Sequence, residues 1–304
     1  MNHAIDKTLK QINQVIYGKP QQIKLAFCCL LARGHLLIED VPGVGKTVLS
    51  HVLANSLGLK FSRIQFTSDL LPADILGSAV YEPANSSFRF HAGPIFNQVV
   101  LADEINRATP KTQSALLEAM EEHQVSIEGK TRALPKPFFV IATQNPGSQI
   151  GTFPLPESQL DRFLMCIELG YPDAKAERLI LAGEDRREIL ETLEPAIDKE
   201  TLQQLQQSVE KIHLSDALLN YVQAILSFSR TSPHYLTGLS PRAGLALVHA
   251  ARAWALIHDR DHVVPEDIQQ LLPYVAAHRL HSSCKMNASN RNEVVAPLTE
   301  VAIP

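Results

Sequence analysis

Residues 36–47 have the side-chain types and the spacing that hold nucleotide phosphates. The apolar residues 36–38 predict a buried strand, the Pro/Gly stretch after it predicts a loop, and Lys46-Thr47 opens a segment with helical apolar spacing. Glycines at 43 and 45 let the loop turn its N–H groups inward, and the dipole of the helix N-terminus favours an anion there. Lys46 would reach the β- and γ-phosphates of a nucleotide, and the Thr47 hydroxyl would ligate Mg²⁺. The candidate phosphate-binding residues are Pro42, Gly43, Val44, Gly45, Lys46, Thr47 and Val48.

This loop departs from the usual G-x-x-x-x-G-K-[ST] pattern at one position, because Asp40 stands where the first glycine is expected. The alternative interpretation is a strand–turn–helix in which the glycines serve only the turn. The rest of the sequence must decide between the two interpretations.

Two adjacent acids follow a second apolar run. Val99 to Ala102 predicts a buried strand, and Asp103 and Glu104 come at its end. In open α/β folds this edge of the sheet is where ligands bind. Beside a phosphate loop, Asp103 would hold Mg²⁺ and Glu104 would orient and polarise the attacking water. A solvated acidic turn is the alternative, and the pairing with the phosphate loop disfavours it.

Two further polar residues are placed for the same chemistry. Asn145 follows the apolar run Phe138 to Thr143 and is suited to hold the lytic water or to contact the γ-phosphate, although Asn-Pro also suits a turn. Arg162 precedes the run Phe163 to Leu169. Its guanidinium is suited to neutralise charge on a γ-phosphate, and a surface salt bridge is the alternative.

The elements that must position these residues form an alternating strand and helix pattern. Continuous apolar strands separated by helices predict a parallel sheet covered on both faces, with five strands. Helices are expected at about 4–15, at 20–32 and after Thr109-Pro110. Two β-hairpins are predicted as inserts, one over residues 79–90 and one over residues 124–134.

From about Pro172 onward the pattern is helical only, with helix starts at Ser215, Ser240-Pro241 and Pro265. We therefore predict an α/β nucleotide-binding core over residues 1–171, a small all-α domain over residues 172–281, and a flexible tail over residues 282–304 or one that docks on a neighbour.

Composition narrows the class of protein. The 304 residues are 45% apolar and 20% charged, as in an ordinary globular protein, and the net charge of −4 gives no basic field for nucleic acid. The four cysteines have no C-x-x-C spacing and are interpreted as packing thiols in a reducing compartment. No segment has the length of a membrane span and residues 1–7 lack the apolar core of a signal peptide, so a cytoplasmic location is expected.

Many motifs in a fixed order give the chain a family resemblance. It resembles the MoxR-type branch of the AAA+ ATPases from about Val15 to Leu280. The segments that carry the resemblance are Val15–Lys19, Ile38–Thr47, Phe66–Gly77, Leu101–Ala108 with Lys111 and Gln113, Ala142–Pro146, Leu155–Phe163 and Leu239–Ala243. Members of this branch are alike in tolerating a non-glycine residue at the position of Asp40.

The resemblance implies a role for each candidate site residue. Lys46 and Thr47 match Walker A, Asp103 and Glu104 match Walker B, Asn145 matches sensor 1, Arg162 matches an arginine finger that acts in trans, Arg242 matches sensor 2, and Ile16 and Gly18 match the segment that lines the adenine. Arg242 lies in the first turn of a helix, where the dipole disfavours a cation, which a phosphate nearby would explain. Arg107 and Arg132 are further candidates for a trans arginine.

The resemblance also implies a biological setting. It implies an Mg²⁺-dependent, ATP-hydrolysing hexameric ring that acts as a chaperone on protein complexes, including the insertion of metal cofactors, often with a partner carrying a von Willebrand factor A domain. The two hairpins resemble the helix-2 and pre-sensor-1 inserts, which point toward the pore of the ring. A nucleic-acid motor and a nucleotide-gated scaffold with little turnover are the alternatives. His278, His281 and Cys284 have a spacing like metal ligands but are interpreted as the end of a helix.

Overall fold

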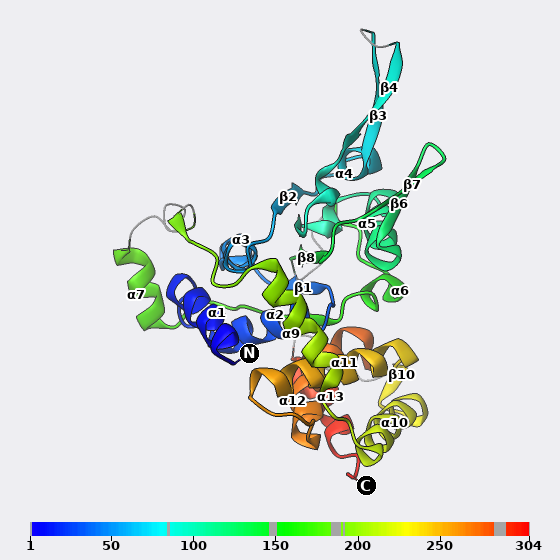
Figure 1. Ribbon diagram of the computed structural model, residues 1–304. Helices are drawn as coiled ribbons and strands as arrows, with labels where there is room; N and C mark the ends of the chain where they lie inside the picture. Colours follow the sequence, from blue (N-terminus) through cyan, green and yellow to red (C-terminus); the bar gives the residue numbers. More distant parts are fainter. Residues whose placement is uncertain are drawn as a thin grey trace.

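The computed structural model describes residues 2–83, 86–145, 151–183, 190, 192–282 and 290–303. Its centre is a five-stranded parallel sheet with the strand order β2-β5-β8-β1-β9 (Figure 1). The strands are β1 (Leu36–Glu39), β2 (Phe61–Gln65), β5 (Val99–Asp103), β8 (Phe139–Gln144) and β9 (Met165–Ile167). The predicted fold class and the predicted number of parallel strands are confirmed.

Both faces of this sheet are buried, which explains why its strands have continuous apolar sequences. Leu36 and Ile38 of β1 belong to one apolar cluster, together with residues of α1–α3 and of the C-terminal helices. Leu37, between them, belongs to a second cluster on the other face, together with residues of α5. Alternate side chains of a strand point to opposite faces, so a strand covered on both sides needs apolar residues at successive positions.

Six helices accompany the sheet. They are α1 (Asn2–Val15), α2 (Pro20–Leu31), α3 (Lys46–Ser56), α4 (Pro72–Leu76), α5 (Pro110–Glu122) and α6 (Glu157–Leu160). Proline at the first position of α2 and α5 has no N–H to leave unpaired, which suits a helix start. Both helices begin where the sequence predicted.

The two predicted hairpins are present. The first is formed by β3 (Gly77–Glu82) and β4 (Ser87–Ala92), and the second by β6 (Gln124–Ile127) and β7 (Lys130–Ala133). Figure 1 shows both hairpins extending from the end of the core that lies away from the C-terminal helices. Arg132 of the second hairpin lies over the ring of Phe90 in the first, 3.8 Å from its centroid, so the two inserts contact each other.

The C-terminal part is a helical lid. Among the described residues its helices are α7 (Ala174–Ala182), α9 (Lys199–Lys211), α10 (Asp216–Thr231), α11 (Pro241–Ile257), α12 (Pro265–Val275) and α13 (Arg291–Thr299). Ser215 and Ser240 cap α10 and α11 through their side chains, as their place before each helix predicts. The lid shares one apolar cluster with α2, so it packs directly on the core.

Two details of the lid differ from the sequence-based expectation. The prediction of a flexible tail is wrong for α13, because Val295 and Leu298 are buried in the cluster that also contains α12. A short antiparallel ladder between β10 (Tyr235–Thr237) and β11 (His281–Ser282) also adds strand structure to a domain predicted to be all-helical. Both segments are short and weakly patterned, and their structure depends on tertiary contacts.

Among the described residues, no helix has the combined length and apolarity that crossing a bilayer requires.

Candidate functional site

The phosphate loop connects β1 to α3 in the predicted way. Gly43 and Gly45 have φ values of +86° and +96°, in the left-handed region that favours glycine. A side chain at either position would meet no atom within 4 Å, so backbone conformation and not space requires glycine there. Gly45 also offers no side chain to cap α3, which leaves the first N–H groups of that helix directed at the loop.

Lys46 is buried and lies between the loop and the sheet. Its Nζ donates to the backbone oxygen of Asp40 at 2.6 Å and to Oδ1 of Asn145 at 3.2 Å. Burial lowers the pKa of Lys46, and the carboxylates of Asp40, Asp103 and Glu104 oppose that shift. The ammonium group is thus held among acceptors at the carboxyl edge of the sheet.

Asp103 is held by two neighbours that sequence reasoning did not identify. Its Oδ1 accepts from the Thr143 hydroxyl at 2.6 Å, and its Oδ2 accepts from Nη2 of Arg63 at 2.6 Å. Arg63 is half exposed on β2, whose sequence mixes apolar and polar residues, so no sequence pattern required a carboxylate partner there. Its contact with Asp103 depends on the pairing of β2 with β5.

The donor set fits a magnesium ion. Asp103 offers a nearly buried carboxylate and Thr47 a half-buried hydroxyl at the start of α3. Both are hard oxygen ligands, and Mg²⁺ in nucleotide sites is held by one or two such groups together with phosphates and water. These are the residues that would hold the ion.

Glu104 has a strained backbone and three side-chain partners. Its φ of +57° is rare for a residue with a side chain, and such strain concentrates at functional sites. Its Oε2 accepts from Gln65 at 3.0 Å and from Arg107 at 2.9 Å, and its Oε1 accepts from Asn145 at 3.3 Å. Asn145, directly after β8, therefore bridges Lys46 and Glu104. Its place after a buried strand predicted a position beside the acids, and the structure adds the contact with Lys46.

Asp40, the departure from the usual loop pattern, fastens the loop to the end of the sheet. Its Oδ2 accepts from the backbone N–H groups of Leu169 at 2.7 Å and Gly170 at 2.6 Å, and its Oδ1 accepts from Val41 at 2.8 Å. The carboxylate thus joins the first residue of the loop to the segment that leads into the lid. These hydrogen bonds give Asp40 a structural role that a glycine at this position could not perform.

The predicted adenine-side segment lies beside the hinge between the core and the lid, which is the connection from β9 to α7 at residues 168–173. Ile16 is buried, and a Cβ at Gly18 would come within 2.9 Å of the Ala176 side chain on α7. Lys19 donates to the backbone oxygen of Tyr171 at 2.7 Å. The segment that would line the base therefore contacts the same hinge that Asp40 holds.

Arg162 and Arg242 lie together, but not with Lys46. Arg242 forms an ion pair with Glu121 at 2.5 Å, and Arg162 pairs with the same carboxylate at 3.4 Å and donates to the backbone oxygen of Leu117 at 2.8 Å. Arg162 precedes β9, whereas the phosphate loop follows β1. Because these strands are parallel, Arg162 is at the amino edge and Lys46 at the carboxyl edge. Arg242 lies in the first turn of α11, where the helix dipole disfavours a cation, and the Glu121 carboxylate compensates its charge.

The remaining candidates have other partners. Arg107 pairs with Glu104 of the same chain, and Arg132 is engaged by Phe90. His278 is buried and hydrogen-bonds the backbone oxygen of Phe163 at 3.2 Å, and His281 pairs with Glu157 at 3.0 Å. Cys284 and Pro146 lie outside the described residues. No group of metal-ligating side chains was found among those that the structure describes.

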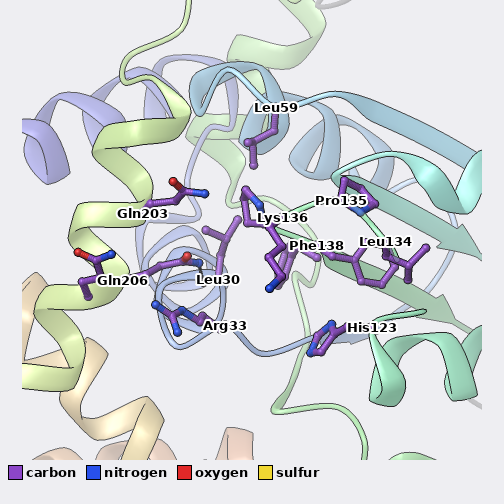
Figure 2. Close-up of a pocket in the computed structure, with 13 residues that line it drawn as sticks. Leu30, Arg33, Leu59, His123, Leu134, Pro135, Lys136, Phe138, Gln203 and Gln206 are labelled. Carbon is purple, nitrogen blue, oxygen red and sulfur yellow. Dashed lines mark hydrogen bonds between the residues drawn. The ribbon is translucent and has the colours of Figure 1, made fainter. Parts of the chain in front are cut away.

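A cavity of about 470 Å³ lies apart from the phosphate loop. Figure 2 shows Gln203 and Gln206 of α9 facing Lys136 and Phe138 across it, with Arg33 at the end of α2. Phe139, which also lines it, is the first residue of β8, so the cavity is at the amino edge of the sheet. It is not part of the site around Lys46.

Comparisons with family models and with known proteins agree on one family. Residues 35–165 match the model of the ATPase family associated with various cellular activities (AAA), and residues 227–300 match that of the AAA lid domain. The chain is 46% identical to YeaC, an uncharacterized protein of Bacillus subtilis, over 100% of this chain and 96% of that protein. It is 40% identical to Chaperone MoxR1 of Mycobacterium tuberculosis, over 91% of this chain and 76% of that protein.

A solved structure agrees with these sequence matches. The crystal structure of a candidate ATPase from Cytophaga hutchinsonii superposes with a TM-score of 0.89 at 34% identity, and the match covers 100% of this chain and 96% of that one. The likeness extends over the core, both inserts and the lid. Core and lid therefore share one evolutionary origin with these proteins.

Proposed function

The chain belongs to the MoxR-type branch of the AAA+ ATPases, and from that premise we propose that it binds and hydrolyses ATP with Mg²⁺ as a ring-forming, chaperone-like remodeller of protein complexes. The observation that carries the proposal is the convergence of Lys46, Asp103, Glu104 and Asn145, from the start of α3 and the ends of β5 and β8, at one edge of the sheet.

Each of these residues has a role that its contacts support. The loop N–H groups and Lys46 bind the β- and γ-phosphates and orient the terminal one. Thr47 and Asp103 hold Mg²⁺, which when bound neutralises charge on the phosphate oxygens. Glu104 orients the attacking water and accepts its proton, and Asn145 fixes the carboxylate relative to Lys46. Before it can act, Glu104 must exchange the Arg107 and Gln65 contacts for that water.

Arg162 and Arg242 complete the site of a neighbouring subunit. Both lie at the amino edge, where neither faces the phosphates of its own loop. A catalytic arginine with no access to its own nucleotide is useful only if the site is shared between subunits. This supports a closed ring, and we propose a hexamer.

The inserts and the relatives support a protein client. The hairpin of β3 and β4 exposes Val80, Tyr81 and Phe88 at its far end, away from the lid. Exposed apolar side chains on a projecting element suit contact with another protein. One relative is named a chaperone. We accordingly propose a cytoplasmic chaperone that activates a protein complex, includes metal-cofactor insertion among its tasks, and works with a partner carrying a von Willebrand factor A domain.

Steady-state ATP hydrolysis by two variants tests the proposal. Lys46→Ala removes the phosphate-binding cation, so nucleotide binding and turnover should both be lost. Glu104→Gln keeps the shape of the side chain but cannot accept a proton, so it should bind ATP and lose turnover by about 10²- to 10⁴-fold. Arg33→Ala, which breaks an exposed surface pair with Glu210, is the control and should behave like the wild type. Turnover near the wild-type level in either site variant would refute the mechanism.

A further inference from the structure

Two consecutive acids end β1 and begin the phosphate loop, and their carboxylates are held on different sides. Asp40 binds the backbone of Leu169 and Gly170, whereas Glu39 binds Arg291 of the C-terminal helix α13. We propose that Arg291 is a positioning residue for nucleotide binding, which acts on the phosphate loop through Glu39. The inference rests on the proposed function in one respect, namely that the loop binds a nucleoside triphosphate.

Within the part of the chain that the structure describes, the guanidinium of Arg291 contacts the ends of two core strands. Its Nη2 pairs with Oε2 of Glu39 at 2.9 Å, its Nε pairs with Oε1 of Glu168 at 2.9 Å, and its Nη1 donates to the backbone oxygen of Cys166. The side chain is 12% exposed. A residue of the lid therefore joins the carboxyl ends of β1 and β9, immediately before the loop and the hinge.

Glu39 also contacts the neighbouring strand β8. Its second oxygen accepts from the side chain of Gln144, and Gln144 directly precedes Asn145. The backbone N–H of Asp40 donates to the oxygen of Gln144 at 3.1 Å. Arg291 thus contacts the residue before Asp40 directly, and it reaches the residue before Asn145 through Glu39. Asp40 and Asn145 in turn accept hydrogen bonds from Lys46.

The attachment of α13 does not itself require this arginine. Val294, Val295 and Leu298 are buried in the apolar cluster shared with α12, and Tyr235 donates its hydroxyl to the backbone oxygen of Val294 at 2.8 Å. Replacing a buried ion pair by well-packed apolar residues is often neutral or stabilising, so a contact of this kind is weak evidence of a role in stability alone. What it fixes is the orientation of Glu39, and with it the start of the loop.

Coupling of this kind is reciprocal. If α13 favours the form of the loop that binds nucleotide, then bound nucleotide must favour the attached form of α13 by the same free energy. Hydrogen exchange of the α13 amides should therefore slow when the wild type binds ADP, and should slow less in Arg291→Gln.

The main experiment measures the Kd of the fluorescent analogue mant-ADP, with Mg²⁺, for variants of the full chain. Arg291→Gln and Glu39→Gln should each raise the Kd about tenfold, and the double variant should bind no more weakly than either single one, because one interaction is removed in all three. Arg291→Lys should recover part of the affinity. The matched control is Glu168→Gln, which removes the other ion pair of the same arginine and should change the Kd by less than about twofold.

A purely structural role predicts a different pattern. It would lower the melting temperature of Arg291→Gln and leave its Kd at the wild-type value, and that result would overturn the inference. So would equal effects of Glu39→Gln and Glu168→Gln. Arg260→Gln, which breaks the lid pair with Asp267, gives the reference for destabilisation without a change in affinity. Failure of the wild type to bind mant-ADP would instead refute the proposed function, so the two failures are distinguishable.

Discussion

The two edges of the central sheet are built on different principles. At the carboxyl edge the charged groups that would act on ATP have partners within the chain, with Lys46 and Glu104 both bonded to Asn145 and Asp103 bonded to Thr143. At the amino edge two arginines, Arg162 and Arg242, share a single carboxylate, that of Glu121, which is 35% exposed.

This difference separates a preorganised site from an incomplete one. A network whose donors and acceptors are matched holds its geometry before the ligand arrives, which is what catalysis requires. Two guanidinium groups on one partly exposed carboxylate leave positive charge available to an anion from outside. The difference supports the proposal that one edge of the sheet carries the site for the chain's own nucleotide and the opposite edge contributes to the site of a neighbouring subunit.

Removing an arginine from the amino edge tests whether this edge contributes to catalysis. Arg162→Ala should keep nucleotide affinity and lose about 10³-fold in turnover, because arginine fingers act on the transition state and not on binding. Turnover and mant-ADP affinity, measured on the same preparation, check this. Weakened binding with unchanged turnover would place Arg162 in its own subunit's site.

Mixing experiments test whether the arginine acts on a neighbour. Subunits with Arg162→Ala have an intact carboxyl edge, and subunits with Lys46→Ala have an intact amino edge. A mixture should recover part of the turnover that each lacks alone. No recovery at any ratio of the two would count against a shared site.

At the carboxyl edge, replacing Asp40 tests whether the phosphate loop must be fastened to the end of the sheet. Asp40→Asn replaces one carboxylate oxygen by an NH₂ group that cannot accept, so either the hydrogen bond from Val41 or the two from Leu169 and Gly170 are lost. Hydrogen bonds to a charged group are worth about 1.5–3 kcal/mol, so we expect nucleotide affinity to fall by about 10- to 100-fold. Asp40→Gly restores the usual loop pattern. It loses the hydrogen bonds but places no NH₂ group against the backbone N–H groups, so its nucleotide affinity should fall less. Wild-type affinity in Asp40→Asn would show that the loop needs no such fastening.

Much of this arrangement was predictable from sequence because it depends on local pattern. The strand–loop–helix at residues 36–56, the acids that end β5 and the serine caps of the lid helices follow from apolar spacing, glycine conformation and capping chemistry. Parallel strands end at the same edge, so the meeting of Lys46, Asp103 and Asn145 also followed once the sheet was predicted.

The unpredicted features depend on contacts between distant parts of the chain. Arg291 and Glu39 are 252 positions apart, and no local pattern links them. The place of Arg242 beside Arg162 depends on how the lid sits on α5, which helical periodicity does not determine. Helix α13 was missed because its sequence has weak amphipathicity and a proline at position 297, and burial against α12 compensates for both.

Acidification should destabilise the fold slightly, through two buried histidines at the amino edge. His35 and His278 are buried at the amino edge, where they contact Met120 and Phe163 respectively. Burial lowers the pKa of His35 from 6.5 to about 4, and it also lowers the pKa of His278. His35 accepts a hydrogen bond at Nδ1 from the N–H of Val140, which requires that nitrogen to be unprotonated.

The direction of the pH effect follows from these shifts. Between about pH 6.5 and pH 4 the unfolded chain carries a proton on His35 that the folded chain does not, so stability is lost as the pH falls through that window. From pH 7 to pH 5 the loss should be about 2 kcal/mol from His35, with His278 adding to it. Urea unfolding of the wild type and of His35→Gln at both pH values measures the difference. Because glutamine does not titrate, the variant should lose less stability on acidification, and an equal loss would mean that His35 does not carry the effect.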